Sequence, residues 1–218
     1  MMMRWLVLGF LNIGSTQAAD MLALRYVDQD PGEAPSLTRI LVTPAFMRMD
    51  GGRDDGDFVL LDRRRRVVIN VMHGNKMAMV FTSGKLPPKP ATWKPLLTLH
   101  SAAPGTQRFM LSVNKVVCSE GMALQRAAPD AARAMAELKA VLAAMQYRVW
   151  KESPATMQHD CDLANQVWET GTTLALGLPL EEREFTGRTR KFESQTRQPL
   201  QPSLFRVPDG LARINGPS

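Results

Sequence analysis

Histidine and cysteine are scarce in this 218-residue chain, which has three histidines and two cysteines. The residues that most often supply general bases and zinc ligands are therefore few. The segment His159–Asp162 holds one histidine and one cysteine, but no second Cys/His pair lies at zinc spacing. We predict no metal site, no cofactor, no catalytic residue and no enzymatic activity.

Glycine-rich phosphate loops and nucleophile elbows are also missing. Gly51, Gly52 and Gly56 lie in an acidic turn, which would repel a phosphate group. His73 stands beside Gly74 in another turn, a position typical of an exposed side chain rather than of a general base. The sequence therefore gives no sign of nucleotide or acyl-transfer chemistry.

The longest apolar run lies at the start of the chain, and no later segment is apolar enough to cross a membrane. Met1–Arg4 is short and basic, Trp5–Ile13 is apolar, and Gly14–Ala19 is small and polar. This order is that of a secretory signal peptide, and a membrane span would need about 20 apolar residues. We expect residues 1–19 to be a signal peptide, the mature chain to have no transmembrane segment, and the protein to be exported. A buried N-terminal strand or helix is the alternative.

Positive charge is in excess, with 27 Lys and Arg residues against 21 Asp and Glu residues and a net charge of +6. Such an excess favours anionic surfaces. For an exported protein we expect an anionic envelope surface and no nucleic acid as partner; the alternative is that the charge mainly aids solubility. The densest basic run, Arg63–Arg66, either binds phosphate groups or, more simply, forms the solvated tip of a hairpin.

The two cysteines, Cys118 and Cys161, are a small even number in a chain with an export signal. In an oxidising compartment this favours a disulfide bond, and the alternative is two buried free thiols.

Alternation of apolar and polar residues predicts strands from Asp20 to Phe81. The predicted strands are one around Leu22–Tyr26, then Leu37–Val42, Phe46–Met49, Phe58–Leu61, Val67–Met72 and Met77–Phe81. Turn residues separate them, so we expect an antiparallel meander. Residues 84–104 hold five prolines and are predicted to be an ordered loop, followed by one strand over Gln107–Cys118.

The clearest helix is predicted over Pro129–Gln146, where apolar residues recur at spacings of three and four. That stripe consists of Ala131, Met135, Leu138, Leu142 and Met145. A second helix is predicted to begin at Asp160 and to end before Gly177. Leu180–Thr196 is polar and predicts one or two solvent-facing strands at the outside of the sheet. With no repeat in the sequence, we expect residues 20–218 to be a single domain.

Methionine pairs mark two of the predicted strands: Met47 with Met49, and Met77 with Met79. In a strand the members of each pair share one face. Thioethers pack in cores, adapt to ligands in apolar cavities, or bind Cu(I), and all three interpretations stay open. The candidate lining residues of an apolar cavity are Met47, Met49, Met77, Met79, Phe109 and Leu111.

Two longer runs carry a resemblance to a known family. Leu37–Asp50 ends in an arginine–apolar–acidic step, and Asp57–His73 contains an aspartate–basic hairpin. Together with Pro202–Pro208 and Cys161–Asn165, they resemble uncharacterised Gram-negative periplasmic proteins related to the lipoprotein-localisation-factor (LolA/LolB-like) superfamily. The stretch 181–197, rich in Arg and Glu, is unlike a purely apolar lining.

The resemblance implies an α+β fold: a curved antiparallel sheet, or unclosed barrel, with helices on its concave side. It also implies a periplasmic location and a hollow that could hold acyl chains. We therefore expect a non-enzymatic protein that binds a lipid or other amphiphile, with rim arginines meeting anionic headgroups. The alternative is a structural or interaction protein of the envelope with no small ligand.

Overall fold

The computed structural model describes residues 20–216 of the chain, so the predicted signal peptide lies outside the described residues. The strands are β1 (Asp20–Gln29), β2 (Ser36–Val42), β3 (Phe46–Asp50), β4 (Phe58–Asp62), β5 (Val67–Met72), β6 (Met77–Thr82), β7 (Pro95–Ser101), β8 (Thr106–Val113), β9 (Val116–Leu124), β10 (Leu178–Glu184), β11 (Thr189–Pro199) and β12 (Ala212–Asn215). The helices are α1 (Pro129–Glu152) and α2 (Asp160–Leu163), with short helical turns η1 (Ala155–Met157), η2 (Ala164–Trp168), η3 (Leu174–Leu176) and η4 (Pro202–Phe205).

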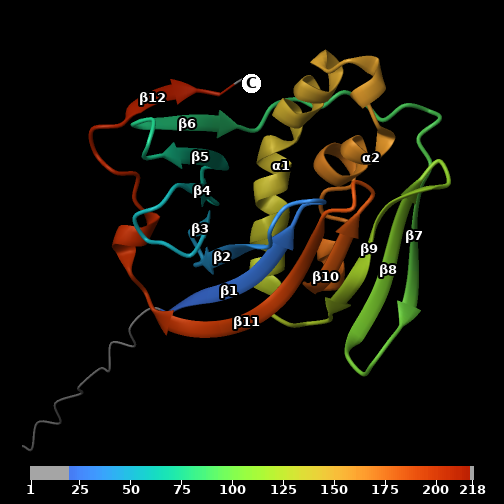
Figure 1. Cartoon of the computed structure of the whole chain (residues 1–218), viewed down its shortest axis with the longest axis horizontal. Helices are drawn as coiled ribbons and strands as arrows, with labels where there is room; N and C mark the ends of the chain where they lie inside the picture. The colour runs from blue at the N-terminus through green and yellow to red at the C-terminus, as the bar shows by residue number, and fades with distance from the viewer. Residues whose placement is uncertain (1–19, 217–218) are drawn as a thin grey trace, which may run out of the picture.

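All twelve strands belong to one sheet, in the order β12-β6-β5-β4-β3-β2-β1-β11-β10-β9-β8-β7. The pairing of β12 with β6 is parallel and the other pairings are antiparallel. The sheet is not closed, because β12 and β7 are its two ends. Figure 1 shows α1 with β2–β6 on one side of it and β7–β10 on the other. The fold is thus mostly β, with a few helices.

The six strands predicted between residues 20 and 81 all form, and their alternation decides what each face of the sheet contacts. Leu24 and Tyr26 of β1 belong to a core that includes residues of α1. Met21 and Ala23, which point to the opposite face, pack with Leu204 and other residues of the C-terminal segment. Both faces of this half of the sheet are therefore buried, one by a helix and one by the chain end.

Helix α1 begins at Pro129 as predicted and continues six residues past the predicted end, to Glu152. Its buried residues include Met135 and Leu138, while Leu142 is partly buried against the same core. The predicted apolar stripe therefore packs on the sheet, where it makes contacts with β2, β5, β6 and β10.

The solvated-tip interpretation of the basic run is wrong for its first arginine. The Arg63 guanidinium donates to Asp130 at 2.9 Å and to Glu137 at 2.6 Å, both on α1, and its side chain is only 8% exposed. The other arginines of the run, residues 64–66, are exposed. One member of the run therefore attaches the β4–β5 hairpin to the helix.

The arginine–apolar–acidic step forms a buried ionic cluster on the face opposite α1. The Nε of Arg48 donates to Asp50 at 2.6 Å, and its Nη1 donates to the carbonyl of Leu204 at 2.9 Å. Arg39 also donates twice to the same aspartate, at 2.8 Å each. This motif of the family resemblance thus fixes the C-terminal segment to the sheet.

Two predictions between residues 84 and 124 are wrong. The proline-rich segment contains β7, which starts at Pro95, so the earlier prolines precede the strand and do not interrupt it. Residues 107–118 form a hairpin of β8 and β9 rather than one strand. Asn114 and Lys115 at its turn both have positive φ angles, of 52° and 72°, which suits a tight two-residue hairpin loop.

The predicted second helix is also wrong in length: it consists of the four residues of α2, followed by the π-helical turn η2. Tertiary contacts hold this irregular path. Asn165 donates to the carbonyl of Cys118 at 3.1 Å, and Glu169 accepts from the indole of Trp93 at 3.0 Å. The disulfide between Cys118 and Cys161 is confirmed, with Cα atoms 4.8 Å apart.

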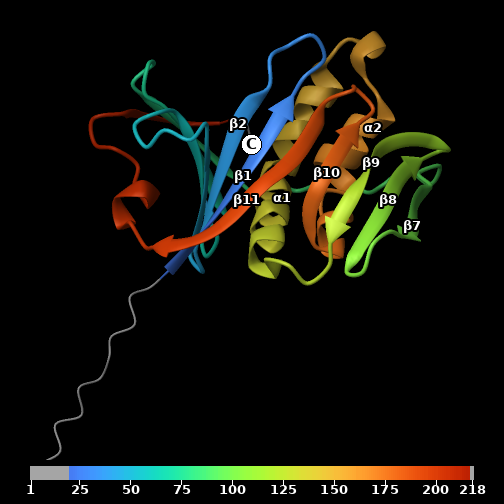
Figure 2. The ribbon, with the colours of Figure 1, turned by 60° about the horizontal axis from the view of Figure 1, so that its bottom comes forward.

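The polar stretch after Leu180 forms two strands as predicted, β10 and β11, but the expectation that they are outer strands is wrong, because they lie between β1 and β9 in the middle of the sheet. Only residues 181–183 of β10 pair with β11, whereas β11 pairs with β1 along ten positions. Figure 2 shows β11 beside β1, with β10, β9 and β8 following on its other side. The β10–β11 hairpin therefore joins two parts of the sheet, and it lies at the site described next.

Candidate functional site

A cavity of about 210 Å³ lies between α1 and the sheet. Its apolar lining comes from β2 and β3 on one side and from α1 on the other. These apolar residues are Ile40, Met47, Met49, Met135, Leu138 and Leu142, and Leu174 of η3 and Pro179 of β10 complete the apolar lining. The apolar lining side chains belong to or pack against the core beneath α1, and the cavity is partly open to solvent.

Charged side chains form the other wall of the cavity. Four come from the β10–β11 hairpin and one from α1: Glu182, Glu184, Arg188, Arg190 and Lys139. We call these five residues the polar wall. Glu182 pairs with Arg190 across the two strands, and the Glu184 amide donates to the Arg188 carbonyl at the turn, so the four hairpin residues alternate onto one face, which lines the cavity.

The arginines of the polar wall are bound to aspartates. Arg190 donates through two nitrogens to both carboxylate oxygens of Asp28, each at 2.7 Å. Arg188 lies 3.7 Å from Asp28 and 3.8 Å from Asp30. Burial alone would raise the pKa of Asp28, but the hydrogen bonds from Arg190 and Thr38 hold this pKa below its usual range.

The glutamates of the polar wall, unlike Asp28, have no hydrogen-bonded arginine in the described part of the chain. Within residues 20–216, neither Glu182 nor Glu184 makes a side-chain hydrogen bond or an ion pair shorter than 4 Å. Burial raises the pKa of Glu184, against the opposing effect of the Lys139 ammonium. The Lys139 Nζ donates to the carbonyl of Asn165, at 3.4 Å. The wall thus combines one arginine that is hydrogen-bonded to an aspartate, Arg190, with two glutamates that have no hydrogen-bond partner among the described residues.

A buried hydroxyl lies close to this wall. Tyr26 and Asp28 share a face of β1, and the Arg190 guanidinium lies 5.4 Å from the centre of the tyrosine ring. The Tyr26 side chain is buried, and its hydroxyl has no hydrogen-bond partner among the described residues. Burial raises the pKa of this hydroxyl, and the Glu182 carboxylate raises it further.

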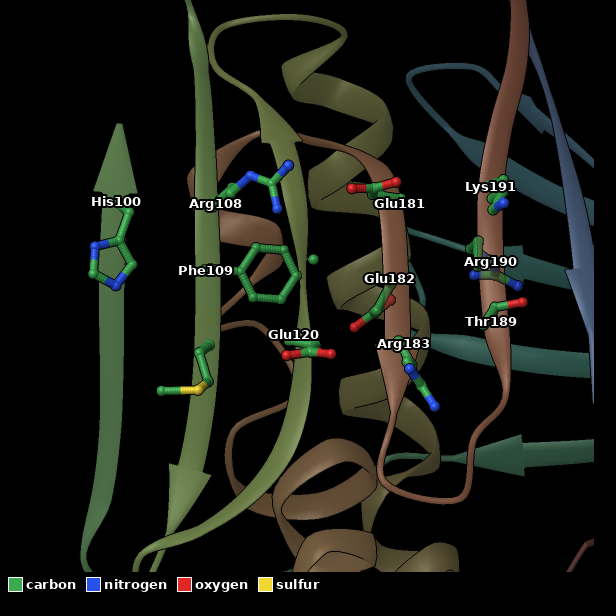
Figure 3. Close-up of a pocket in the computed structure, with 12 residues that line it drawn as sticks. His100, Arg108, Phe109, Glu120, Glu181, Glu182, Arg183, Thr189, Arg190 and Lys191 are labelled. Carbon is green, nitrogen blue, oxygen red and sulfur yellow. The ribbon is translucent and has the colours of Figure 1, made fainter. Parts of the chain in front are cut away.

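A second hollow, of about 440 Å³, lies over β7–β11 and is drawn in Figure 3. Arg108 and Glu181 extend toward one another across it. The pairing register places both on the face of the sheet opposite the polar wall. The ring of Phe109 packs against Gly121, where any Cβ would collide with it and with the Glu181 carbonyl. This hollow is charged and mixed in sign, and it shares Glu182 and Arg190 with the polar wall of the cavity.

The structure separates the six candidate lining residues. Met47 and Met49 line the cavity, and Phe109 lines the second hollow. Met77 and Met79 lie on β6, and Leu111 is buried in β8; none of these three lines either space. Since β4 and β5 separate the two methionine-bearing strands, the methionine pairs lie about 14 Å apart.

Sequence reasoning missed the polar wall. The signal was the alternation of Glu182 with Glu184 and of Arg188 with Arg190, which places all four on one face of a hairpin. Their position next to α1 depends on a pairing between β1 and β11 that spans most of the chain, and no local pattern indicates it.

Within residues 20–216, no three His, Cys, Asp or Glu side chains are arranged to hold a metal ion. Across the same residues, no helix combines the length and the apolar character needed to cross a membrane.

Neither the family models nor the curated proteins include a match to this chain. Among solved structures, the chain is similar to an uncharacterised conserved protein from Thermus thermophilus, with a TM-score of 0.43, 13% identity and 92% of each chain covered. A LolA superfamily protein from Nitrosomonas europaea aligns with a TM-score of 0.30 and 8% identity, over 88% of this chain and 91% of that one. PNGF-II aligns with a TM-score of 0.37 and 10% identity, over 91% of this chain but 31% of its own. Likenesses this distant do not assign a family.

Proposed function

We propose that this chain is a non-enzymatic, exported protein that binds an amphiphile in the cavity between α1 and the sheet. In this proposal the face that α1 covers is the concave side of an unclosed barrel of the LolA-like kind. The observation that carries the proposal is the cavity itself, which is apolar along α1, β2 and β3 and charged at the β10–β11 hairpin. That division matches a molecule with an apolar tail and a polar head.

The cavity volume limits how much of a ligand can enter. At about 210 Å³ it is smaller than the roughly 300–1,000 Å³ of pockets that enclose drug-sized ligands. One short tail, or one end of a longer tail, would fit. Met47, Met49 and Met135 are unbranched and flexible, so the lining can adapt to a larger apolar group.

The disulfide is consistent with the proposed export. Bonds of this kind persist in oxidising compartments such as the periplasm and are rare in the cytosol. The proposed location therefore rests on the disulfide together with the signal-like residues 1–19.

The test is to purify the protein from periplasm for native mass spectrometry and to titrate it with n-octanol by calorimetry. We expect amphiphile adducts and saturable octanol binding. Met49→Trp would fill the cavity and should abolish both, whereas Met79→Trp changes the same residue type on β6, outside the cavity, and should abolish neither. Absent adducts together with absent octanol binding, or equal binding by two folded variants, would overturn the proposal.

A second candidate is supported by the free edge of the sheet. β7 ends the strand order, carries no Lys, Arg, Asp or Glu, and exposes 61% of Leu96. Edge strands are usually protected by charges, so an apolar uncharged edge can pair with a strand of an envelope protein. A photocrosslinker at position 96 should then capture one specific partner in cells, and Leu96→Lys should weaken the pull-down of that partner. Failure to capture a partner would remove this candidate.

A further inference from the structure

We propose that the polar wall selects amphiphiles whose headgroup is an ammonium group. This inference rests on the proposed function and specifies its ligand class. It is the opposite of what the net charge of +6 suggests, which is an anionic headgroup.

The first argument is that Arg190 has little left to offer an anion. Arg190 already holds both oxygens of Asp28 through two charge-assisted hydrogen bonds of 2.7 Å. Arg188 lies 3.7 Å from Asp28 and 3.8 Å from Asp30, so two carboxylates already face its charge, although neither accepts a hydrogen bond from it. An anionic headgroup would have to displace Asp28 from Arg190 or approach these carboxylates at Arg188, and either lowers the gain from binding.

The second argument is that Glu182 and Glu184 are acceptors without donors. Both line the cavity, and neither has a hydrogen-bonded or ion-paired partner within the described residues. A partly buried carboxylate in this state gains most from a cation that also donates hydrogen bonds. An ammonium group supplies up to three such donors.

The third argument is the charge balance around the wall. The wall and its ion-pair partners hold three cations and four carboxylates: Lys139, Arg188 and Arg190 against Asp28, Asp30, Glu182 and Glu184. The local charge is therefore negative by one while the chain as a whole is positive. Lys139 influences Glu184 from α1 without forming an ion pair, so neither glutamate has a paired cation among the described residues.

The buried hydroxyl of Tyr26 lies close to the polar wall, on the same face of the sheet. Asp28 pairs with Arg190 across β1 and β11, and Arg190 pairs with Glu182 across β11 and β10. The tyrosine lies two residues before Asp28 in β1, and its hydroxyl has no partner among the described residues. Tyr26 does not line the cavity itself, so among the described residues its hydroxyl is an unpaired polar group beside the wall and not a direct contact for the headgroup.

The experiment compares three probes that share one tail: n-octylammonium, n-octanol and octanoate, each titrated into the purified protein by calorimetry at pH 7. We expect octylammonium to bind at least about tenfold more tightly than octanol, as suits a hydrogen bond to a charged group. Octanoate should bind more weakly than octanol. In the double variant Glu182→Gln/Glu184→Gln, octylammonium and octanol should bind equally, with octanol affinity unchanged.

The matched control is Glu181→Gln, which removes the same charge from the opposite face of β10 and should keep the tenfold preference. Octanol binding without a preference for octylammonium, or a preference that survives in the double variant, would overturn this inference and leave the proposed function standing. Absent binding of all three probes would overturn the proposed function instead. If the double variant does not fold, the order of the three affinities on the unsubstituted protein still tests the preference for an ammonium headgroup.

Discussion

Replacing Asp50 by asparagine tests whether the buried ionic cluster holds the C-terminal segment on the sheet. The Asp50 carboxylate accepts from Arg39, from Arg48 and from the backbone amide of Gly52. Arg48 is 2% exposed, lies 3.9 Å from the centre of the Phe58 ring, and has no other ion-pair partner among the described residues. Asparagine keeps the shape of the aspartate but removes its charge.

The expected cost follows from what remains buried. Removing one partner of a buried ion pair costs about 3–5 kcal/mol, since the other charge stays in the core without compensation. We expect the lower end, about 3 kcal/mol, because Arg39 keeps Asp54 and the asparagine keeps one acceptor oxygen. Arg48 would still donate to the carbonyls of Leu204 and Asp54, so the cluster would weaken rather than vanish.

Urea unfolding with the disulfide intact measures this cost as the change in the free energy of unfolding. Asp54→Asn is the matched control: its carboxylate also pairs with Arg39 but is 60% exposed, so its loss should cost less than about 1 kcal/mol. Equal costs for the two variants, or a cost below about 1 kcal/mol for Asp50→Asn, would refute the reasoning.

The pH dependence of the same cluster gives an independent check. Burial alone would raise the pKa of Asp50, but hydrogen bonds from Arg39, Arg48 and Gly52 hold it below its ordinary value. The resulting stability is fully present above the unfolded pKa of about 3.9 and is lost as the pH falls through the lower folded pKa. The difference in the free energy of unfolding between wild type and Asp50→Asn should therefore decrease below about pH 4.

Three further predictions follow from other parts of the structure. Reducing the disulfide, which spans 43 residues, should lower the free energy of unfolding by about 4 kcal/mol and the melting temperature with it; an unchanged melting curve would contradict this. Glu184→Gln should raise the free energy of unfolding at pH 7, because burial raises the folded pKa of Glu184 and makes its charged form unfavourable in the native state. As the pH falls toward about 4, the native wild type takes up a proton at Glu184 and the difference in stability between the two proteins should disappear; a difference that persists would exclude burial of the charge as its cause. Gly121→Ala should destabilise the protein by about 1–3 kcal/mol in urea unfolding, since its Cβ would meet the Glu181 backbone and the Phe109 ring, whereas Gly74→Ala, in open space, should be close to neutral.

Much of the fold could be predicted from local sequence patterns. The strands between residues 20 and 81 could be predicted from period-2 alternation. Each strand buries the side chains of at least one face, and neighbouring strands must place their apolar side chains on the same face. The stripe that includes Met135 and Leu138 predicts α1 and its buried side for the same reason. The disulfide could be predicted from the count of two cysteines together with the predicted signal peptide.

Other features depend on contacts between distant residues. The hairpin turn at Asn114 and Lys115 lacks a glycine signal, and η2 forms where Asn165 reaches the Cys118 carbonyl. Strand β12 exists only because residues 212–215 meet the edge of β6. In each case the local sequence permits several conformations, and packing against a remote segment selects one.

The candidate site divides in the same way. Met47 and Met49 could be predicted as cavity residues, because alternation places them together on an apolar face. Nothing in the same pattern separates them from Met77 and Met79, since a lining residue and a core residue look alike in a strand. Sequence alternation places side chains on faces. Only the tertiary structure decides which face has space beside it, because that depends on how α1 and the β10–β11 hairpin approach the sheet.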